Sequence, residues 1–282
     1  MIDPRAIVST NWLALHLKSP DVRIVDGSFY LPDARRNAQE EYQREHIPGA
    51  VFFDIDEIAD EKSPYPHMLP SPEKFSSRVR ALGLGDGNKI VVYDGAGIFS
   101  AARVWWMFKV MGHDDVAVLD GGLPKWKREH RALTDHVTAI RASHFTPRPR
   151  TALVRNSRQV AEALETGSET VVDVRSAERF QGRSPEPRPG VRSGHMPGAI
   201  NLPYRDLLAE DGTLLKGEAL KARVRAAGLA PSDRIVASCG SGVTAAILFL
   251  ALDTLGYRNL ALYDGSWAEW GARGDLPLAV GA

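Results

Sequence analysis

The sequence contains one pattern twice, and this internal repeat restricts the possible folds more than any other feature of the chain. Four segments of the first half recur in the same order, 144 to 149 residues later. The pairs are RIVDGS (23–28) with TVVDVR (170–175), HIPGAVFFDI (46–55) with HMPGAINLPY (195–204), KIVVYDGAGIFSAA (89–102) with RIVASCGSGVTAAI (234–247), and VAVLDGGLPKW (116–126) with LALYDGSWAEW (260–270). Chance could produce one such match, but four in register indicate two tandem copies of one domain.

The two copies set the expected domain organisation. We expect an N-terminal domain over residues 1–135, a linker over 136–153 and a C-terminal domain over 154–282. The linker is predicted because this stretch is polar, contains prolines and has no sustained periodicity. Within each copy, short Val/Ile-rich runs alternate with longer apolar helical patterns. This alternation predicts an α/β fold, in which each domain has a mainly parallel sheet flanked by helices.

Composition excludes several classes of partner. Lys+Arg and Asp+Glu both number 35, so no net charge favours nucleic acid or an anionic membrane as a partner. No window reaches the ~18 apolar residues that cross a bilayer, and acidic Asp3 and Pro4 argue against a signal peptide. The single cysteine excludes an internal disulfide and a multi-cysteine zinc site. We therefore expect a cytoplasmic protein with a free thiol, without a metal or a nucleotide cofactor.

The single cysteine, Cys239, lies between a predicted strand and a predicted helix. A Gly-Ser-Gly follows it, and the helix begins near Val243 or Thr244. Gly240 and Gly242 permit backbone conformations that turn successive N–H groups into the loop, and the helix adds unpaired amides and the positive end of its dipole. These amides would stabilise a nucleophilic thiolate and hold the sulfur of a substrate. The alternative is an inert cysteine packed as a small hydrophobic residue.

The surroundings of this loop argue against phosphate chemistry. A cysteine phosphatase needs an arginine six positions after its cysteine, and this chain has Ala245 there. The loop has no positively charged side chain, which suits a weakly charged or neutral sulfur group. In the first copy Asp94 stands where the second has Cys239, and a carboxylate cannot act as a sulfur nucleophile. The N-terminal domain is therefore expected to be structural, or to lend side chains to a site in the C-terminal domain.

The loop resembles the active-site loop of the 3-mercaptopyruvate sulfurtransferases, which are tandem-domain members of the rhodanese superfamily. The resemblance rests on CGSGVTA after an apolar strand in the second copy, and it extends over nearly the whole chain. The other matching motifs are HIPGA, SPYPHMLP, RVWWMF, LDGG, SPEPR, GHMPGA and YDGSW. The resemblance implies transfer of sulfane sulfur from 3-mercaptopyruvate to a thiol acceptor or cyanide, through a persulfide on Cys239, with release of pyruvate.

The resemblance also implies which residues hold the substrate. Family members of this type bind the substrate with arginines that match Arg179 and Arg188, in the loop-like stretch ERFQGRSPEPRPG. An arginine fork pairs bidentately with a carboxylate, and mercaptopyruvate has one. The alternative is that both are solvated surface arginines, like Arg183 and Arg192 in the same stretch.

A relay of three side chains is implied as well. In the resembling family, residues that match Asp56 and His67 act together with the loop serine, here Ser241. Such an arrangement would orient the imidazole and let the hydroxyl polarise or protonate the departing oxygen. Spacing alone does not make Asp56 and His67 neighbours, and without the family His67 would be interpreted as a surface or core histidine. His46 and His195, at equivalent repeat positions, are expected to be structural.

Other activities stay open at this point. A thiosulfate sulfurtransferase differs only in its donor, but thiosulfate-using members tend to carry positively charged residues after the cysteine, which this loop lacks. A non-catalytic sulfur carrier or sensing module would need no substrate arginines. Because the chain has no second cysteine, sulfur is expected to leave to an external acceptor such as cyanide, a small thiol or reduced thioredoxin.

Overall fold

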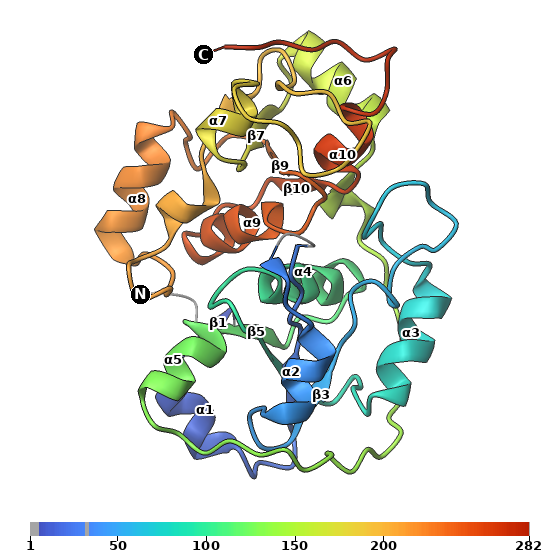
Figure 1. The fold of residues 1–282 in the computed structure, drawn as a ribbon, viewed down its shortest axis with the longest axis vertical. Coiled ribbons are helices and arrows are strands. Elements are labelled where there is room, and N and C mark those ends of the chain that lie inside the picture. Colours follow the sequence, from blue (N-terminus) through green and yellow to red (C-terminus); the bar gives the residue numbers. More distant parts are fainter. Residues whose placement is uncertain (1–5, 32–33, 282) are drawn as a thin grey trace.

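The computed structural model describes residues 6–31 and 34–281 of the chain. Over these residues it forms two α/β domains, the first in the lower half of Figure 1 and the second in the upper half. Each has a five-stranded parallel sheet, with the order β1-β5-β4-β2-β3 in the first domain and β6-β10-β9-β7-β8 in the second. The predicted α/β fold and its duplication are therefore confirmed.

The two domains share most of their elements. The strands are β1 (Ile7–Val8), β2 (Val22–Asp26), β3 (Ala50–Phe52), β4 (Lys89–Tyr93), β5 (Val116–Leu119), β6 (Val154–Arg155), β7 (Thr170–Asp173), β8 (Ile200–Asn201), β9 (Ile235–Ser238) and β10 (Leu260–Tyr263). The helices are α1 (Thr10–His16), α2 (Ala38–Arg44), α3 (Pro72–Ala81), α4 (Ala101–Val110), α5 (Gly122–Arg128), α6 (Ser157–Thr166), α7 (Ala177–Phe180), α8 (Gly217–Ala226), α9 (Ala245–Thr254) and α10 (Ser266–Trp270), with 3-10 turns η2 (Thr151–Leu153) and η3 (Tyr204–Leu207).

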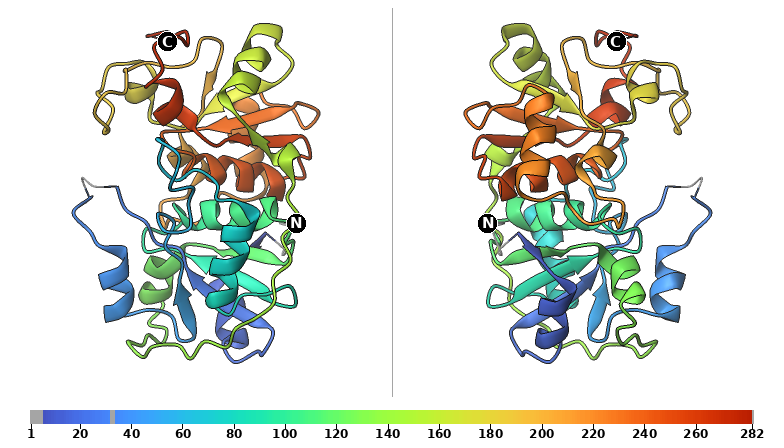
Figure 2. Two further views of the ribbon diagram at one scale, coloured as in Figure 1. Left: turned by 90° about the vertical axis from the view of Figure 1, so that its right-hand side faces the viewer. Right: turned by 90° about the vertical axis from the view of Figure 1, so that its left-hand side faces the viewer.

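Helices α4 and α9 pack against each other between the two sheets (Figure 2). Both are mostly apolar around their circumference, so neither could face water without exposing hydrophobic surface, and both are buried along nearly their whole length. Trp105 of α4 meets Phe249 of α9 edge to face, with ring centroids 6.0 Å apart. The largest cluster of buried apolar side chains continues from one domain into the other. The domain interface is thus part of the hydrophobic core.

The segment predicted as a linker lies against the first domain. Residues 137–150 contain no helix or strand. Thr138 donates its hydroxyl to the carbonyl of Ala50 at 2.7 Å, Phe145 is buried among the aromatic side chains of the first domain, and the amide of Arg148 donates to the carbonyl of Met111 at 2.8 Å. The predicted boundaries at residues 135 and 154 stay predictions.

The paired histidines of the repeat have matching structural contacts. Nδ1 of His46 lies 2.7 Å from the carbonyl oxygen of Tyr42, and its ring stacks on the ring of that tyrosine. Nδ1 of His195 lies 2.8 Å from the carbonyl oxygen of Phe180, and these two rings also stack. Each histidine therefore holds the chain in place just before the Pro-Gly-Ala turn of its copy.

Two aspartates that precede glycines do more than form turns. Asp120, after β5, accepts a hydrogen bond from the amide of Leu214 in the second domain, at 2.9 Å. Asp264, after β10, accepts one from the amide of Leu69 in the first domain, at 2.7 Å. Each sheet therefore offers a carboxylate to a loop of the other domain, and these two contacts fix how the loops from residues 69 and 214 meet the neighbouring domain.

Candidate active site

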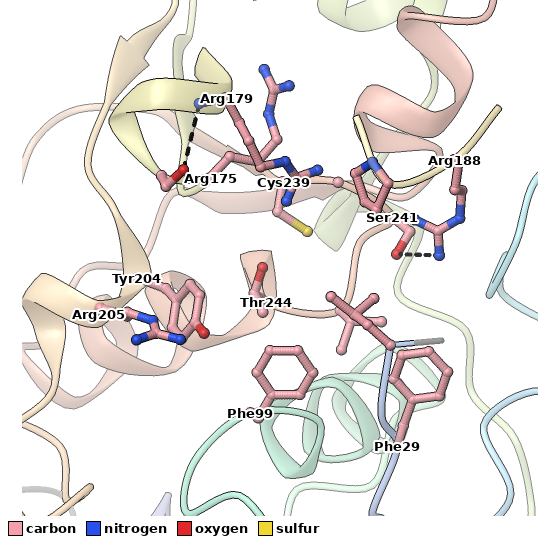
Figure 3. Close-up of a pocket in the computed structure, with 15 residues that line it drawn as sticks. Phe29, Phe99, Arg175, Arg179, Arg188, Tyr204, Arg205, Cys239, Ser241 and Thr244 are labelled. Carbon is pink, nitrogen blue, oxygen red and sulfur yellow. Dashed lines mark hydrogen bonds between the residues drawn. The ribbon is translucent and has the colours of Figure 1, made fainter. Parts of the chain in front are cut away.

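Cys239 directly follows β9, where a parallel sheet places its binding sites, and its side chain is almost fully buried. Its sulfur points into a pocket of about 220 Å³ that lies between the two domains (Figure 3). The first domain contributes the aromatic side chains of Phe29 and Phe99 to the wall. The second contributes Arg179 and Arg188, which lie on the other sides of the sulfur. The buried thiol therefore lines a small pocket to which two arginines also contribute.

The carbonyl groups of the cysteine loop point away from the sulfur because other amides hold them. The carbonyl of Cys239 accepts from the amide of Trp267 at 2.9 Å, and that of Gly240 accepts from the amide of Ala268 at 2.8 Å. In a planar trans peptide the C=O and the next N–H point in opposite directions. The amides of Gly240 and Ser241 are thereby turned away from α10.

The N–H groups of this loop are available to a ligand. Within the described part of the chain, the amides of residues 240–243 donate to no protein acceptor. Helix α9 begins at Ala245, with Thr244 as its N-cap, so its first amides and the positive end of its dipole also lie at the loop. Gly242 has φ +76°, a conformation that favours glycine. The loop after Cys239 therefore offers unpaired main-chain donors, and their role in holding a thiolate or a substrate sulfur stays a prediction.

Arg179 approaches the loop closely but shares its charge with a buried glutamate. Its Nη2 and Nε donate to the two carboxylate oxygens of Glu186 at 2.5 and 3.2 Å. The same carboxylate accepts from Arg175 at 2.8 Å. A Cβ at position 240 would lie 3.0 Å from Nη2 of Arg179, so Gly240 is what allows the guanidinium to pack on the loop. Sequence reasoning found Arg179 but not Glu186, although Glu186 stands inside the SPEPR motif.

Arg188 has no carboxylate partner among the described residues. Its Nη2 lies 3.2 Å from Nε2 of His67 and 3.4 Å from Oγ of Ser241. Burial lowers the pKa of the Arg188 guanidinium below its ordinary value, because a charge out of water is costly. A half-buried cation without a counter-ion, next to the reactive sulfur, is suited to bind an anionic substrate group.

The structure brings together Asp56, His67 and Ser241, but not in the predicted order. Oδ1 of Asp56 lies 2.8 Å from Nδ1 of His67, and this contact holds the pKa of the Asp56 carboxyl below its usual range. Between the described residues His67 and Ser241 there is no direct hydrogen bond, because the guanidinium of Arg188 lies between them. An arginine can only donate, so a hydrogen bond between Arg188 and His67 requires Nε2 of His67 to accept.

Several residues of the pocket were not predicted from the sequence. Phe29, Phe99, Tyr204 and Arg205 line it, and each comes from a loop or turn that follows a strand. Their position after strands was the available signal, because the carboxyl ends of parallel strands meet at one edge of a sheet. Within residues 6–31 and 34–281, no group of three or more His, Cys, Asp or Glu side chains could hold a metal ion.

Comparison with known proteins places this arrangement in a family. The model of the rhodanese-like domain matches the chain twice, over residues 9–129 and 156–273. The chain belongs to the rhodanese family. Both matches cover one α/β domain each, so the family pattern and the strand order describe the same duplication. Cys239 lies in the second rhodanese-like domain, and the first has Asp94 after the corresponding strand.

Similar rhodanese-family proteins align over almost all of this chain. The 3-mercaptopyruvate sulfurtransferase of Escherichia coli K12 is 42% identical over 96% of both chains. The Arabidopsis thaliana protein named thiosulfate/3-mercaptopyruvate sulfurtransferase 1, mitochondrial, is 43% identical over 96% of this chain and 77% of its own. The crystal structure of the E. coli 3-mercaptopyruvate sulfurtransferase SseA superposes with a TM-score of 0.85 and 39% identity, covering 93% of this chain and 98% of the other. The rat thiosulfate sulfurtransferase is also similar, at 41% identity over 94% of this chain and 92% of its own.

Among the described residues, no helix is both long enough and apolar enough to cross a membrane.

Proposed function

We propose that this chain is a sulfurtransferase that moves a sulfur atom from 3-mercaptopyruvate to a thiol acceptor or cyanide, releasing pyruvate. The observation that carries the proposal is the combination of a single buried cysteine, unpaired main-chain amides after it and an arginine without a counter-ion beside it. The similar proteins named 3-mercaptopyruvate sulfurtransferase, which align over nearly the full chain, support the choice of donor.

The first half-reaction loads sulfur onto the enzyme. The Cys239 thiolate attacks the sulfur of 3-mercaptopyruvate, and an S–S bond forms as the C–S bond breaks. The electron pair of the C–S bond leaves with the three-carbon fragment as the enolate of pyruvate. The former substrate thiol proton, released when the new persulfide ionises, balances the proton that the enolate carbon takes up. The loop amides of residues 240–244 stabilise the negative charge on sulfur before and after transfer.

We assign the substrate carboxylate to Arg188, with Arg179 as the second donor. Arg188 has no carboxylate partner among the described residues, and it lies next to Ser241. Arg179 keeps Glu186 as a partner, so it would offer its remaining N–H groups. When a carboxylate binds Arg188, Ser241 lies at hydrogen-bond reach of the same end of the substrate and could donate to the enolate oxygen. His67 and Asp56 would hold Arg188 and Ser241 in that arrangement.

The second half-reaction needs an external acceptor. A thiolate or cyanide attacks the outer sulfur of the Cys239 persulfide, and the S–S bond breaks to regenerate the thiolate. We propose a small thiol, reduced thioredoxin or cyanide as acceptor, because the chain has no second cysteine to form an internal disulfide. A reducing compartment such as the cytoplasm would keep Cys239 free for each cycle.

Thiosulfate is the second candidate donor, because the similar rat protein is named for it. The loop after Cys239 has no cationic side chain to neutralise a doubly charged donor. We expect kcat/KM to be higher for 3-mercaptopyruvate than for thiosulfate when both are assayed with cyanide. A higher value for thiosulfate would reverse this choice.

Intact-mass measurement tests the covalent step. After incubation with 3-mercaptopyruvate without acceptor, we expect a gain of about 32 Da, one sulfur atom, that maps to Cys239 and disappears when cyanide is added. A protein that turns over donor without this mass gain would contradict the persulfide. A protein that carries sulfur on Cys239 but does not turn over 3-mercaptopyruvate in the presence of cyanide would instead be a sulfur carrier.

A further inference from the structure

We propose that Arg103, which belongs to the N-terminal domain, is a positioning residue for the nucleophile of the C-terminal domain. The inference rests on the proposed function. It states that the Arg103 guanidinium fixes the peptide between Gly242 and Val243 so that the Val243 amide faces the Cys239 sulfur. Arg103 is the first residue of the RVWWMF motif, but no role was predicted for it, and it does not line the Cys239 pocket.

Arg103 is a fully buried charge on the interface helix α4. Its side chain has no exposed surface, and its Nη2 lies 2.7 Å from Oδ1 of Asp264 in the second domain. Its guanidinium also lies 4.5 Å from the ring centre of Trp106. Burying an ion pair is expensive, and a hydrophobic pair of the same size would often be as stable. Stability alone therefore does not account for a charged residue at this position.

The other contacts of the Arg103 guanidinium are with the main chain on both sides of the site. Nη1 of Arg103 donates to the carbonyl of Gly242 at 3.4 Å, and Nη2 donates to the carbonyl of His67 at 2.5 Å. Gly242 and His67 are both in the left-handed region, with φ +76° and φ +60°. A single guanidinium thus holds two unusual backbone conformations, one in the cysteine loop and one at the histidine beside Arg188.

The contact with Gly242 decides which way one loop amide points. Because the Gly242 carbonyl is turned toward Arg103, the N–H of Val243 in the same peptide plane points the opposite way. Val243 lines the Cys239 pocket, whereas Gly242 does not. Amides of α10 fix the carbonyls of Cys239 and Gly240 in a comparable way, as Arg103 fixes that of Gly242.

The peptide between Gly242 and Val243 is the one that would flip if Arg103 were removed. Among the described residues, Arg103 is the donor that the structure gives to the Gly242 carbonyl. Glycine crosses between backbone regions at low cost, so the peptide after Gly242 can invert. An inverted peptide would aim a carbonyl, rather than an N–H, at the thiolate. Position 242 also requires glycine, since a Cβ there would lie 2.7 Å from the carbonyl oxygen of Asp264.

The test measures the cysteine without turnover. We would follow alkylation of Cys239 by iodoacetamide against pH, in the absence of donor and acceptor, for the wild type, Arg103→Gln and Arg103→Lys. The lysine keeps the positive charge near Asp264, but its single nitrogen replaces the two Nη atoms that separately reach the carbonyls of Gly242 and His67. We expect the pH of half-maximal alkylation to rise by about one unit in both variants, with kcat for sulfur loading reduced about 100-fold, as for loss of one preorganised donor.

The matched control is Arg155→Gln. Arg155 is another largely buried arginine of the domain pair, with Nη2 2.7 Å from Oε1 of Glu169, and it does not line the pocket. We expect it to lower the melting temperature without moving the alkylation profile. A folded Arg103→Lys protein with a wild-type profile would overturn the proposal, even if Arg103→Gln fails to fold. A wrong proposed function would give a different result. The Cys239→Ser variant would then transfer sulfur as fast as the wild type, whatever the alkylation profiles of the Arg103 variants show.

Discussion

The loops that follow β4 and β9 are built alike and serve opposite purposes. In the first domain the carboxylate of Asp94 accepts hydrogen bonds from the amides of Ala96, Phe99 and Ala101, at 2.8, 2.7 and 2.9 Å. The hydrogen-bonding capacity of these amides is therefore satisfied by an anionic side chain of the same loop. In the second domain Cys239 stands at the same point, and the neighbouring amides stay open. Both copies therefore present main-chain amides after this strand, and in the first copy the Asp94 carboxylate accepts from them, whereas in the second the amides of residues 240–243 have no acceptor among the described residues.

A second contrast lies at the ends of β2 and β7. Asp173, at the end of β7, is paired with Arg175 at 2.6 Å. Asp26, at the end of β2, is just as buried, but it accepts hydrogen bonds from the amide and hydroxyl of Ser28 rather than from a cation. Burial raises the pKa of Asp26 to about 6. The second domain therefore has an ion pair at this position beside its pocket, and the first has a carboxyl held by hydrogen bonds, which is neutral only below about pH 6.

The first domain nevertheless takes part in the site. It supplies the aromatic wall through Phe29 and Phe99, the imidazole of His67 and the guanidinium of Arg103. Phe29 and Phe99 line the pocket, whereas His67 contacts Arg188 and Arg103 contacts the carbonyl of Gly242. Helix α4, which carries Arg103, packs directly on α9. The loss of the nucleophile in one copy has therefore not left that copy without function, since it closes the pocket of the other.

The largest expected effect is at the position where the two loops differ. Cys239→Ser should lower sulfurtransferase turnover by at least about 1000-fold, because the attacking thiolate is gone, while the melting temperature stays close to that of the wild type. Asp94→Asn should instead lower the stability of the protein and leave its turnover unchanged. It weakens charge-assisted bonds to three amides and should cost about 1 to 2 kcal/mol in unfolding free energy, with kcat unchanged. Steady-state assays and thermal melts of both variants would check this, and an inactive Asp94→Asn protein would contradict the division of roles.

A smaller effect is expected at the arginine that lacks a counter-ion. Arg188→Ala should lower kcat/KM for 3-mercaptopyruvate about 100-fold, because the substrate carboxylate loses a charge-assisted partner. Arg188→Lys should recover part of this loss, since the charge remains but the fork does not. Arg183→Ala is the control, because Arg183 is exposed and contacts only Gln181 through its side chain in the described structure. Equal losses for the two alanine variants would remove Arg188 from the substrate site.

The smallest expected effect compares the two buried aspartates. The folded pKa of Asp26, about 6, lies above its ordinary value of 3.8, so stability from the protonated form is lost as pH rises through 6. Asp26→Asn should therefore raise unfolding free energy by roughly 2 kcal/mol at pH 8 and by less at pH 4. Asp173→Asn should lower it, because Arg175 loses a partner in the interior. Denaturant titrations at both pH values would decide, and a gain for Asp26→Asn that does not grow with pH would contradict the assigned cause.

The parts of the protein that were predictable are those encoded in neighbouring residues. The duplication, the α/β class and the strand–loop–helix around Cys239 all follow from short patterns that repeat along the chain. Arg179, Arg188 and His67 came from family resemblance, and the structure adds that Glu186 holds Arg179 and that Arg188 separates His67 from Ser241. No local pattern predicts those pairings, because their partners lie on different loops.

The sequence by itself determined the two copies, their secondary structure and the place of the single thiol, since apolar periodicity and glycine positions act over a few residues. Only the tertiary structure decided what surrounds that thiol. The pairs Arg103–Asp264 and Arg188–His67 join residues more than 100 positions apart. Such contacts exist only once α4 and α9 have buried their apolar surfaces against each other, and this packing brings the side chains of one copy to the loop of the other.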